Sequence, residues 1–169
     1  SRTTLEVKVG TDANDYVANF DDEANVLVVK EYTVNPANGS LSGGTSKYST
    51  WTSTDTQPAL TLKTTNASGT AVYAISALSS YKAYATAYDS SDKAHTNITY
   101  TLSVPEGYVI TNYLMTYNVG TAGQISLNGE LLNATGDHTL SATPNAQTAS
   151  FTLGVPSAGQ QYITIKSIA

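Results

Sequence analysis

The stretch ITYTLSVPEGYVITNYLMTYNV, residues 98–119, decides the fold class. Apolar and polar residues alternate over 98–104, which is the period of a β-strand with one buried face. The turn residues Pro105 and Gly107 follow, and a second strand pattern fills 108–119. We predict that the two strands pair as a hairpin across this short connection.

Similar patterns recur along the chain and predict roughly ten to twelve short strands. The Asn128–Gly129 pair predicts a tight hairpin turn, and the most apolar run, 25–34, is expected to be a central strand. Segment 76–88 also fits helical spacing, but we favour a strand because its surroundings are β. The remaining strand segments are 5–9, 16–20, 60–62, 71–75, 124–127, 130–132, 139–142, 149–153 and 162–168.

Short strands joined by Gly, Asn and Pro turns are typical of an all-β antiparallel sandwich, either jelly-roll or immunoglobulin-like. A length of 169 residues fits one domain, and no Pro- or Gly-rich linker divides the chain. We therefore predict a single β-sandwich domain over 1–169. Because the chain begins with Ser-Arg, we expect it to be excised from a larger secreted protein.

The composition narrows the class of partner. Charged residues make up only 12% of the chain and the net charge is −5, which argues against nucleic acid because phosphates require clustered Lys and Arg. No apolar run approaches the ~20 residues of a membrane span, so we expect no membrane insertion. The chain has 0 cysteines, and we predict a secreted, cell-surface or periplasmic protein.

Catalytic motifs are missing from the sequence. The two histidines, His95 and His138, lie in polar segments that read as loops, and neither is near a nucleophile motif. Most acidic residues lie in turns, where Asp is favoured for local hydrogen bonding. We predict a module that is not an enzyme and needs no cofactor. Turn carboxylates that could hold a structural Ca²⁺ are Asp12, Asp15, Asp21 and Asp22.

The only tryptophan, Trp51, sits among small polar residues, so we expect it on a loop with its indole facing a ligand. The chain has 12 Tyr against 2 Phe, which favours aromatic rings that carry a polar end. Such rings stack on sugar faces while their polar groups bond the hydroxyls. We predict a glycan-binding site formed by Trp51, Tyr48, Lys47, Asp55 and Tyr84.

Three motifs resemble the noncatalytic accessory modules of secreted bacterial sialidases and related glycoside hydrolases. The first is YSTWTSTD at 48–55 with Pro58 and the strand pattern at 60–62. The second is the strand running into VPEGYVITNY over 99–113, and the third is 147–153, which contains SFTL. The resemblance covers most of the chain from about residue 30 onwards, while the first thirty residues match no motif.

The resemblance implies a β-sandwich that targets an attached hydrolase to glycans, with Trp51 and Tyr48 as the positions carried over. A sialic-acid carboxylate would have to meet Lys47, Lys82, Lys93 or backbone N–H groups, and a neutral sugar is an equal expectation. The alternative is a structural immunoglobulin-like spacer or an adhesin or fimbrial domain. A binding module should expose Trp51 in a concave site with converging polar groups, whereas a spacer should bury it or leave it on a convex surface.

Overall fold

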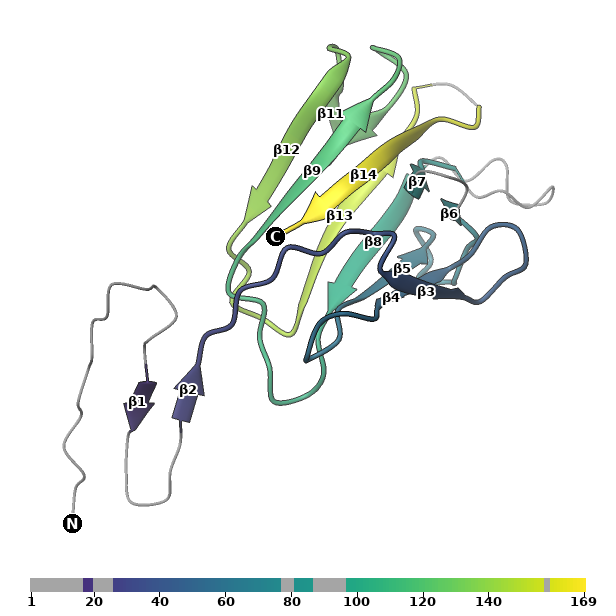
Figure 1. Cartoon of the computed structure of the whole chain (residues 1–169). Helices are drawn as coiled ribbons and strands as arrows, with labels where there is room; N and C mark the ends of the chain where they lie inside the picture. Colours follow the sequence, from purple (N-terminus) through teal and green to yellow (C-terminus); the bar gives the residue numbers. More distant parts are fainter. Residues whose placement is uncertain (1–16, 20–25, 77–80, 87–96, 157–158) are drawn as a thin grey trace. The chain divides into compact units, whose positions relative to one another are not determined.

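The computed structural model describes residues 17–19, 26–76, 81–86, 97–156 and 159–169 (Figure 1). The chain forms two compact units, Ser1–Tyr32 and Thr33–Ala169. In the first unit, β1 (Val17–Asn19) pairs antiparallel with β2 (Val26–Val28). The expectation of a central strand over 25–34 is wrong, because among the described residues 26–34 only 26–28 form a strand, which pairs with β1. The segment 5–9 lies outside the described residues, and one domain over 1–169 stays a prediction.

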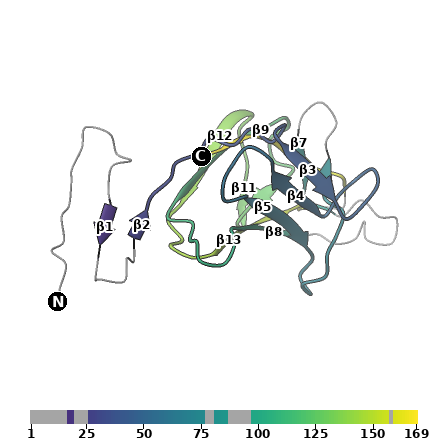
Figure 2. The same ribbon diagram turned by 60° about the horizontal axis from the view of Figure 1, so that its bottom comes forward.

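The second unit is built from two antiparallel sheets that pack as a β-sandwich, which confirms the predicted fold class (Figures 1 and 2). The seven-stranded sheet has the order β11 (Glu130–Leu131), β10 (Ser126–Leu127), β13 (Thr148–Gly154), β8 (Asn97–Ser103), β5 (Thr61–Thr65), β4 (Thr50–Ser53) and β3 (Gly39–Ser42). The five-stranded sheet has the order β12 (Gly136–Ala142), β9 (Tyr113–Val119), β14 (Tyr162–Ile168), β7 (Tyr81–Tyr84) and β6 (Ile75–Ser76).

The strands predicted within 98–119 exist as β8 and β9, but the predicted hairpin between them is wrong. β8 lies between β13 and β5, whereas β9 lies between β12 and β14 in the other sheet. The connection turns at Pro105, whose carbonyl accepts the Tyr108 N–H at 3.2 Å. It then bridges Ile110 to Ala146 before β9 begins. Both strands are flanked on each side, which buries their alternate apolar residues more completely than a lone hairpin would.

Two other local predictions are confirmed. β10 and β11 form a hairpin with Leu127 opposite Glu130, and the turn residues Asn128 and Gly129 have φ values of +50° and +84°. These positive φ values are the reason for the Asn-Gly pair, because a type I′ turn needs them at both positions. Within 76–88, the described residues form strands β6 and β7, as favoured over a helix.

The core fills the space between the two sheets. A cross-strand row of apolar residues runs through five strands of the seven-stranded sheet, and its members are Leu41, Trp51, Leu62, Leu102 and Ala149. On the same sheet, the rings of Tyr100 and Phe151 stack with centroids 5.1 Å apart. The Tyr100 hydroxyl bonds the Tyr84 carbonyl on β7, so a hydrogen bond joins the sheets within the core.

The two ends of the second unit lie next to each other. The Val34 N–H donates to the Ile168 carbonyl at 2.7 Å, and the Ile168 N–H donates back to Val34 at 3.0 Å. This bridge continues the five-stranded sheet beside the end of β14 (Figure 1). The chain therefore enters the sandwich and reaches Ala169 at one place.

Candidate functional site

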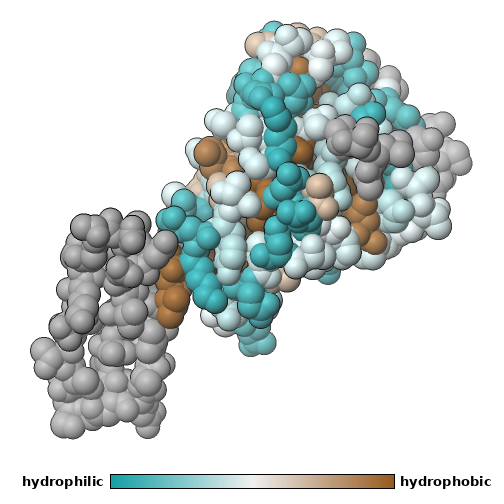
Figure 3. Space-filling view, viewed as in Figure 1, coloured by the Kyte–Doolittle hydropathy of each residue, from teal (hydrophilic) through white to brown (hydrophobic). Residues whose placement is uncertain are grey.

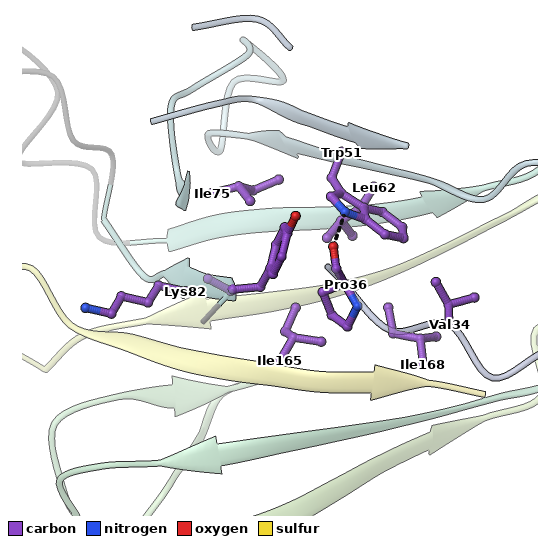
Figure 4. Close-up of a pocket in the computed structure, with 10 residues that line it drawn as sticks. Val34, Pro36, Trp51, Leu62, Ile75, Lys82, Ile165 and Ile168 are labelled. Carbon is purple, nitrogen blue, oxygen red and sulfur yellow. Dashed lines mark hydrogen bonds between the residues drawn. The ribbon is translucent and has the colours of Figure 1, made fainter. Parts of the chain in front are cut away.

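Trp51 lies on β4 and is only 2% exposed, so its predicted position on an exposed loop is wrong. In place of the loop expected around Trp51, the chain forms β3 and β4. Leu41 and Leu62 on the adjacent strands stand opposite Trp51, and they supply the apolar surroundings that its sequence neighbours lack. The indole N–H donates to the Pro36 carbonyl at 2.9 Å, which satisfies its one polar group (Figure 4).

Gly39 makes room for the indole. A β-carbon at this position would overlap the indole ring of Trp51, so the ring lies directly against the Gly39 backbone. An aromatic ring that covers a glycine on an edge strand shields the exposed backbone and adds buried apolar area. Trp51 is thus a core residue of this sandwich.

A small cavity of about 20 Å³ lies beside Trp51 between the sheets (Figure 4). Its volume matches about one water molecule, so a sugar ring does not fit. Lys82 contributes to the wall, but its side chain is directed away from the cavity in Figure 4. The other lining residues are Val34, Pro36, Trp51, Leu62, Ile75, Tyr81, Ala83, Ile165 and Ile168.

The other four predicted site residues do not form one site: Tyr48 and Asp55 make separate hydrogen bonds, whereas Lys47 and Tyr84 contact each other. The hydroxyl of the half-buried Tyr48 donates to the Thr45 carbonyl at 2.9 Å, and the exposed Asp55 accepts a hydrogen bond from Asn38 Nδ2 at 2.9 Å. The first bond lies within a turn, and the second joins the segments just before β3 and just after β4. Lys47 and Tyr84 come together, with the Lys47 ammonium 5.0 Å from the centroid of the Tyr84 ring.

Tyr84 belongs to a cluster that the sequence reading missed. Tyr84 and Tyr162 are opposite each other on β7 and β14, with ring centroids 5.3 Å apart. The Lys82 ammonium lies 4.5 Å from the Tyr162 centroid, which is a cation–π distance. Tyr162 is 40% exposed. Its alternation with the buried Ile163 and Ile165 is the sequence signal that places it on the solvent side.

The outer face of the five-stranded sheet continues this cluster as a line of polar side chains. Cross-strand pairing places Asp137, Asn118, Thr164 and Lys82 in register across β12, β9, β14 and β7, and we call these four residues the outer row. In the space-filling view, the face formed by these strands mixes hydrophilic and intermediate residues with several hydrophobic patches (Figure 3).

Asp137 is the acidic end of the outer row. Its carboxylate accepts hydrogen bonds from Lys166 Nζ at 2.7 Å and from Asn118 Nδ2 at 2.9 Å. The bond from Lys166, followed by that from Asn118, lowers the pKa of Asp137 below its usual value. The carboxylate stays ionised and presents acceptor oxygens at the surface.

The acidic and histidine side chains of the described ranges do not form a cluster. No three His, Asp or Glu side chains there gather closely enough to hold a metal ion. His138 lies on β12, not on the expected loop, and its ring stacks on Tyr117 at 5.8 Å. The four carboxylates suggested for Ca²⁺ (Asp12, Asp15, Asp21 and Asp22) and His95 lie outside the described residues. Where the chain is described, no helix is long and apolar enough to cross a membrane.

Comparison of the chain with protein-family models, with curated proteins and with solved structures gave no match. The resemblance to accessory modules of glycoside hydrolases therefore stays a prediction.

Proposed function

We propose that the sandwich is a noncatalytic accessory module of a secreted or surface-displayed protein, and that it binds glycans on the outer face of its five-stranded sheet. The observation that carries this proposal is the outer row, which ends beside the exposed ring of Tyr162. The proposed binding face is thus moved from Trp51 to the surface around Tyr162 and Lys82, beneath which Tyr84 is buried.

The outer row offers the groups that a sugar needs. Carboxylate, amide, hydroxyl and ammonium side chains accept from and donate to sugar hydroxyls, each on its own strand. Neighbouring strands are about 4.8 Å apart, so the four residues span roughly 14 Å, enough for a short oligosaccharide. The ring of Tyr162 supplies a stacking surface at one end. The ammonium groups of Lys82 and Lys166 would also bond the carboxylate of an acidic sugar.

A glycan array followed by calorimetry tests the proposal. The wild-type chain should bind, and Tyr162→Ala and Lys82→Gln should each weaken binding by about tenfold, which is the loss of one good contact. Tyr108→Ala is the matched control, because Tyr108 is 46% exposed but lies in the 104–112 connection, away from the outer row. Unchanged affinity in both outer-face variants would overturn the assignment of this face.

The second candidate is a structural spacer or adhesin-type domain, and the burial of Trp51 favours it. The adjacent ends of the second unit argue against a load-bearing spacer, because a force between residues 33 and 169 would separate Val34 from Ile168 one hydrogen bond at a time. Pulling single molecules between these ends distinguishes the two. A spacer should resist a high force and bind no glycan, whereas an accessory module should open at low force.

A further inference from the structure

The strand β12 (Gly136–Ala142) is an open edge of the five-stranded sheet. All seven of its residues pair in continuous register with β9, with no bulge. Among the described residues, no backbone group outside β9 forms a hydrogen bond with its backbone. The strand contains no Pro and no Lys, the residues that commonly protect such edges.

The other sheet edges in the described part of the second unit differ from β12. β11 and β6 have two residues each, and Tyr48 forms a β-bridge with Ile75 of β6, which covers that edge. β3 has four residues. A short or covered edge offers few backbone groups to another chain, whereas seven in-register residues offer a full template. β12 is therefore the edge suited to strand addition.

The sequence of β12 is complementary to itself. If a second β12 lies antiparallel with the two Thr139 residues opposite each other, Asp137 faces Ser141 and His138 faces Leu140. The carboxylate of each copy then meets a hydroxyl group, and like charges are not directly opposed. A pair of threonines at the centre is a favourable cross-strand pair.

The inner side of β12 would also gain from an added strand. Its inward residues, among them Leu140 and Ala142, remain half-buried although they pack against the core. On the neighbouring strand β9, the inward residues Met115 and Tyr117 are fully covered. A further strand would bury more of the apolar surface of β12, which stabilises association.

We propose that a second copy of this chain pairs with β12 about a two-fold axis at Thr139. Two five-stranded sheets then join into one continuous sheet of ten strands. Each copy contributes the same strand, so the contact is closed and stops at the dimer. This inference does not depend on glycan binding.

Sedimentation velocity over a concentration series is the first test. The wild-type chain should show a reversible monomer–dimer equilibrium. Thr139→Lys should weaken the dimer by about tenfold or more, because the substitution places two ammonium groups opposite each other. Thr116→Lys is the matched control, because Thr116 is opposite Thr139 on the interior strand β9 and adds the same charge to the same face. A wild-type chain that stays monomeric, or equal loss in both variants, would overturn the proposal.

Cysteine cross-linking tests the register. The chain has 0 cysteines, so each introduced thiol is unique. Thr139→Cys alone should form a disulfide dimer, because Cβ atoms of directly opposed residues lie about 4.5–5.5 Å apart and a small shift of the edge strands brings them to the roughly 3.5–4.5 Å of an S–S bond. Asp137→Cys and Ser141→Cys should each form little dimer alone but cross-link efficiently when mixed. Thr139→Cys cross-linking no faster than Thr116→Cys, with both variants folded by circular dichroism, would contradict pairing at β12.

Discussion

The Tyr100 hydroxyl donates a hydrogen bond to the Tyr84 carbonyl 2.6 Å away and so ties the two sheets together through the core. The same hydroxyl lies 3.2 Å from the Ala74 carbonyl. Tyr100→Phe keeps the stacking on Phe151 but leaves buried carbonyl oxygens without this donor. We expect the variant to lose about 1–3 kcal/mol of unfolding free energy, measured by urea denaturation. Tyr108→Phe, on an exposed side chain, should change nothing, and equal losses in both variants would refute the role of the inter-sheet bond.

Burial raises the pKa of Tyr100 well above 10.0, and it also raises those of Tyr113 and Tyr117. The folded state holds these phenols neutral while the unfolded state ionises them near pH 10, so the unfolded state binds fewer protons at high pH. The contribution of these three tyrosines to stability is therefore constant below about pH 10, and it falls as the pH rises towards their folded pKa values, by at most about 1.4 kcal/mol per pH unit for a fully buried group. Urea unfolding across this range, with tyrosinate absorbance as a second signal, measures the fall. A flat stability profile up to about pH 11 would contradict it.

Gly39→Ala should displace the indole of Trp51 and break its bond to Pro36. Overpacking of this kind costs about 1–3 kcal/mol. Because Trp51 is the only tryptophan, its fluorescence reports the displacement directly as a red shift and stronger quenching by acrylamide. Gly120→Ala is the control, since a β-carbon there meets no atom within 4 Å. Identical fluorescence and stability in the two variants would show that the indole does not depend on Gly39.

The pKa of the Asp137 carboxyl lies below its usual 3.8 because Lys166 and then Asn118 donate hydrogen bonds to it. A lowered folded pKa means that the stabilising contribution is present above the unfolded value and is lost as the pH falls through the folded value. Lys166→Ala should move the pKa upwards towards 3.8, as followed by NMR titration of the carboxyl carbon. Lys63→Ala, on β5 of the other sheet, should leave it unchanged. A pKa that is the same in all three proteins would contradict the assignment.

Regular alternation of apolar and polar residues predicted the positions of the long strands correctly. Strand β14 occupies the predicted 162–168, and β8, β9 and β13 lie within one to five residues of the predicted limits. Successive residues of these strands point alternately to the core and to the solvent, and this decides which of them are apolar. The local sequence pattern is therefore enough to locate the strands.

The sheet to which each strand belongs could not be predicted from local alternation. Pro105 and Gly107 indicate that the chain turns, but a turn between β8 and β9 is compatible with a hairpin or with a crossing to the second sheet. The choice depends on β13 and β14, which come later in the chain and occupy the places beside β8 and β9.

The burial of Trp51 also depends on residues that are distant in the sequence. Its neighbours in sequence are Thr50 and Thr52, whereas its apolar partners Leu41 and Leu62 come from other strands. Lys47 and Tyr84 were predicted from the sequence to belong to one site, and the structure places them in contact. The contact of Tyr84 with Tyr162 needs the register of β7 against β14, which no local pattern contains.

The bridge between Val34 and Ile168 has a consequence for engineering. Since the ends of the sandwich are hydrogen-bonded neighbours, a short peptide could join residue 169 to residue 33, and new termini could be opened in an exposed turn such as Asn66–Gly69. A circular permutant of this kind should fold. For the same reason, the sandwich could be inserted into a surface loop of a host protein without forcing the two ends of that loop apart.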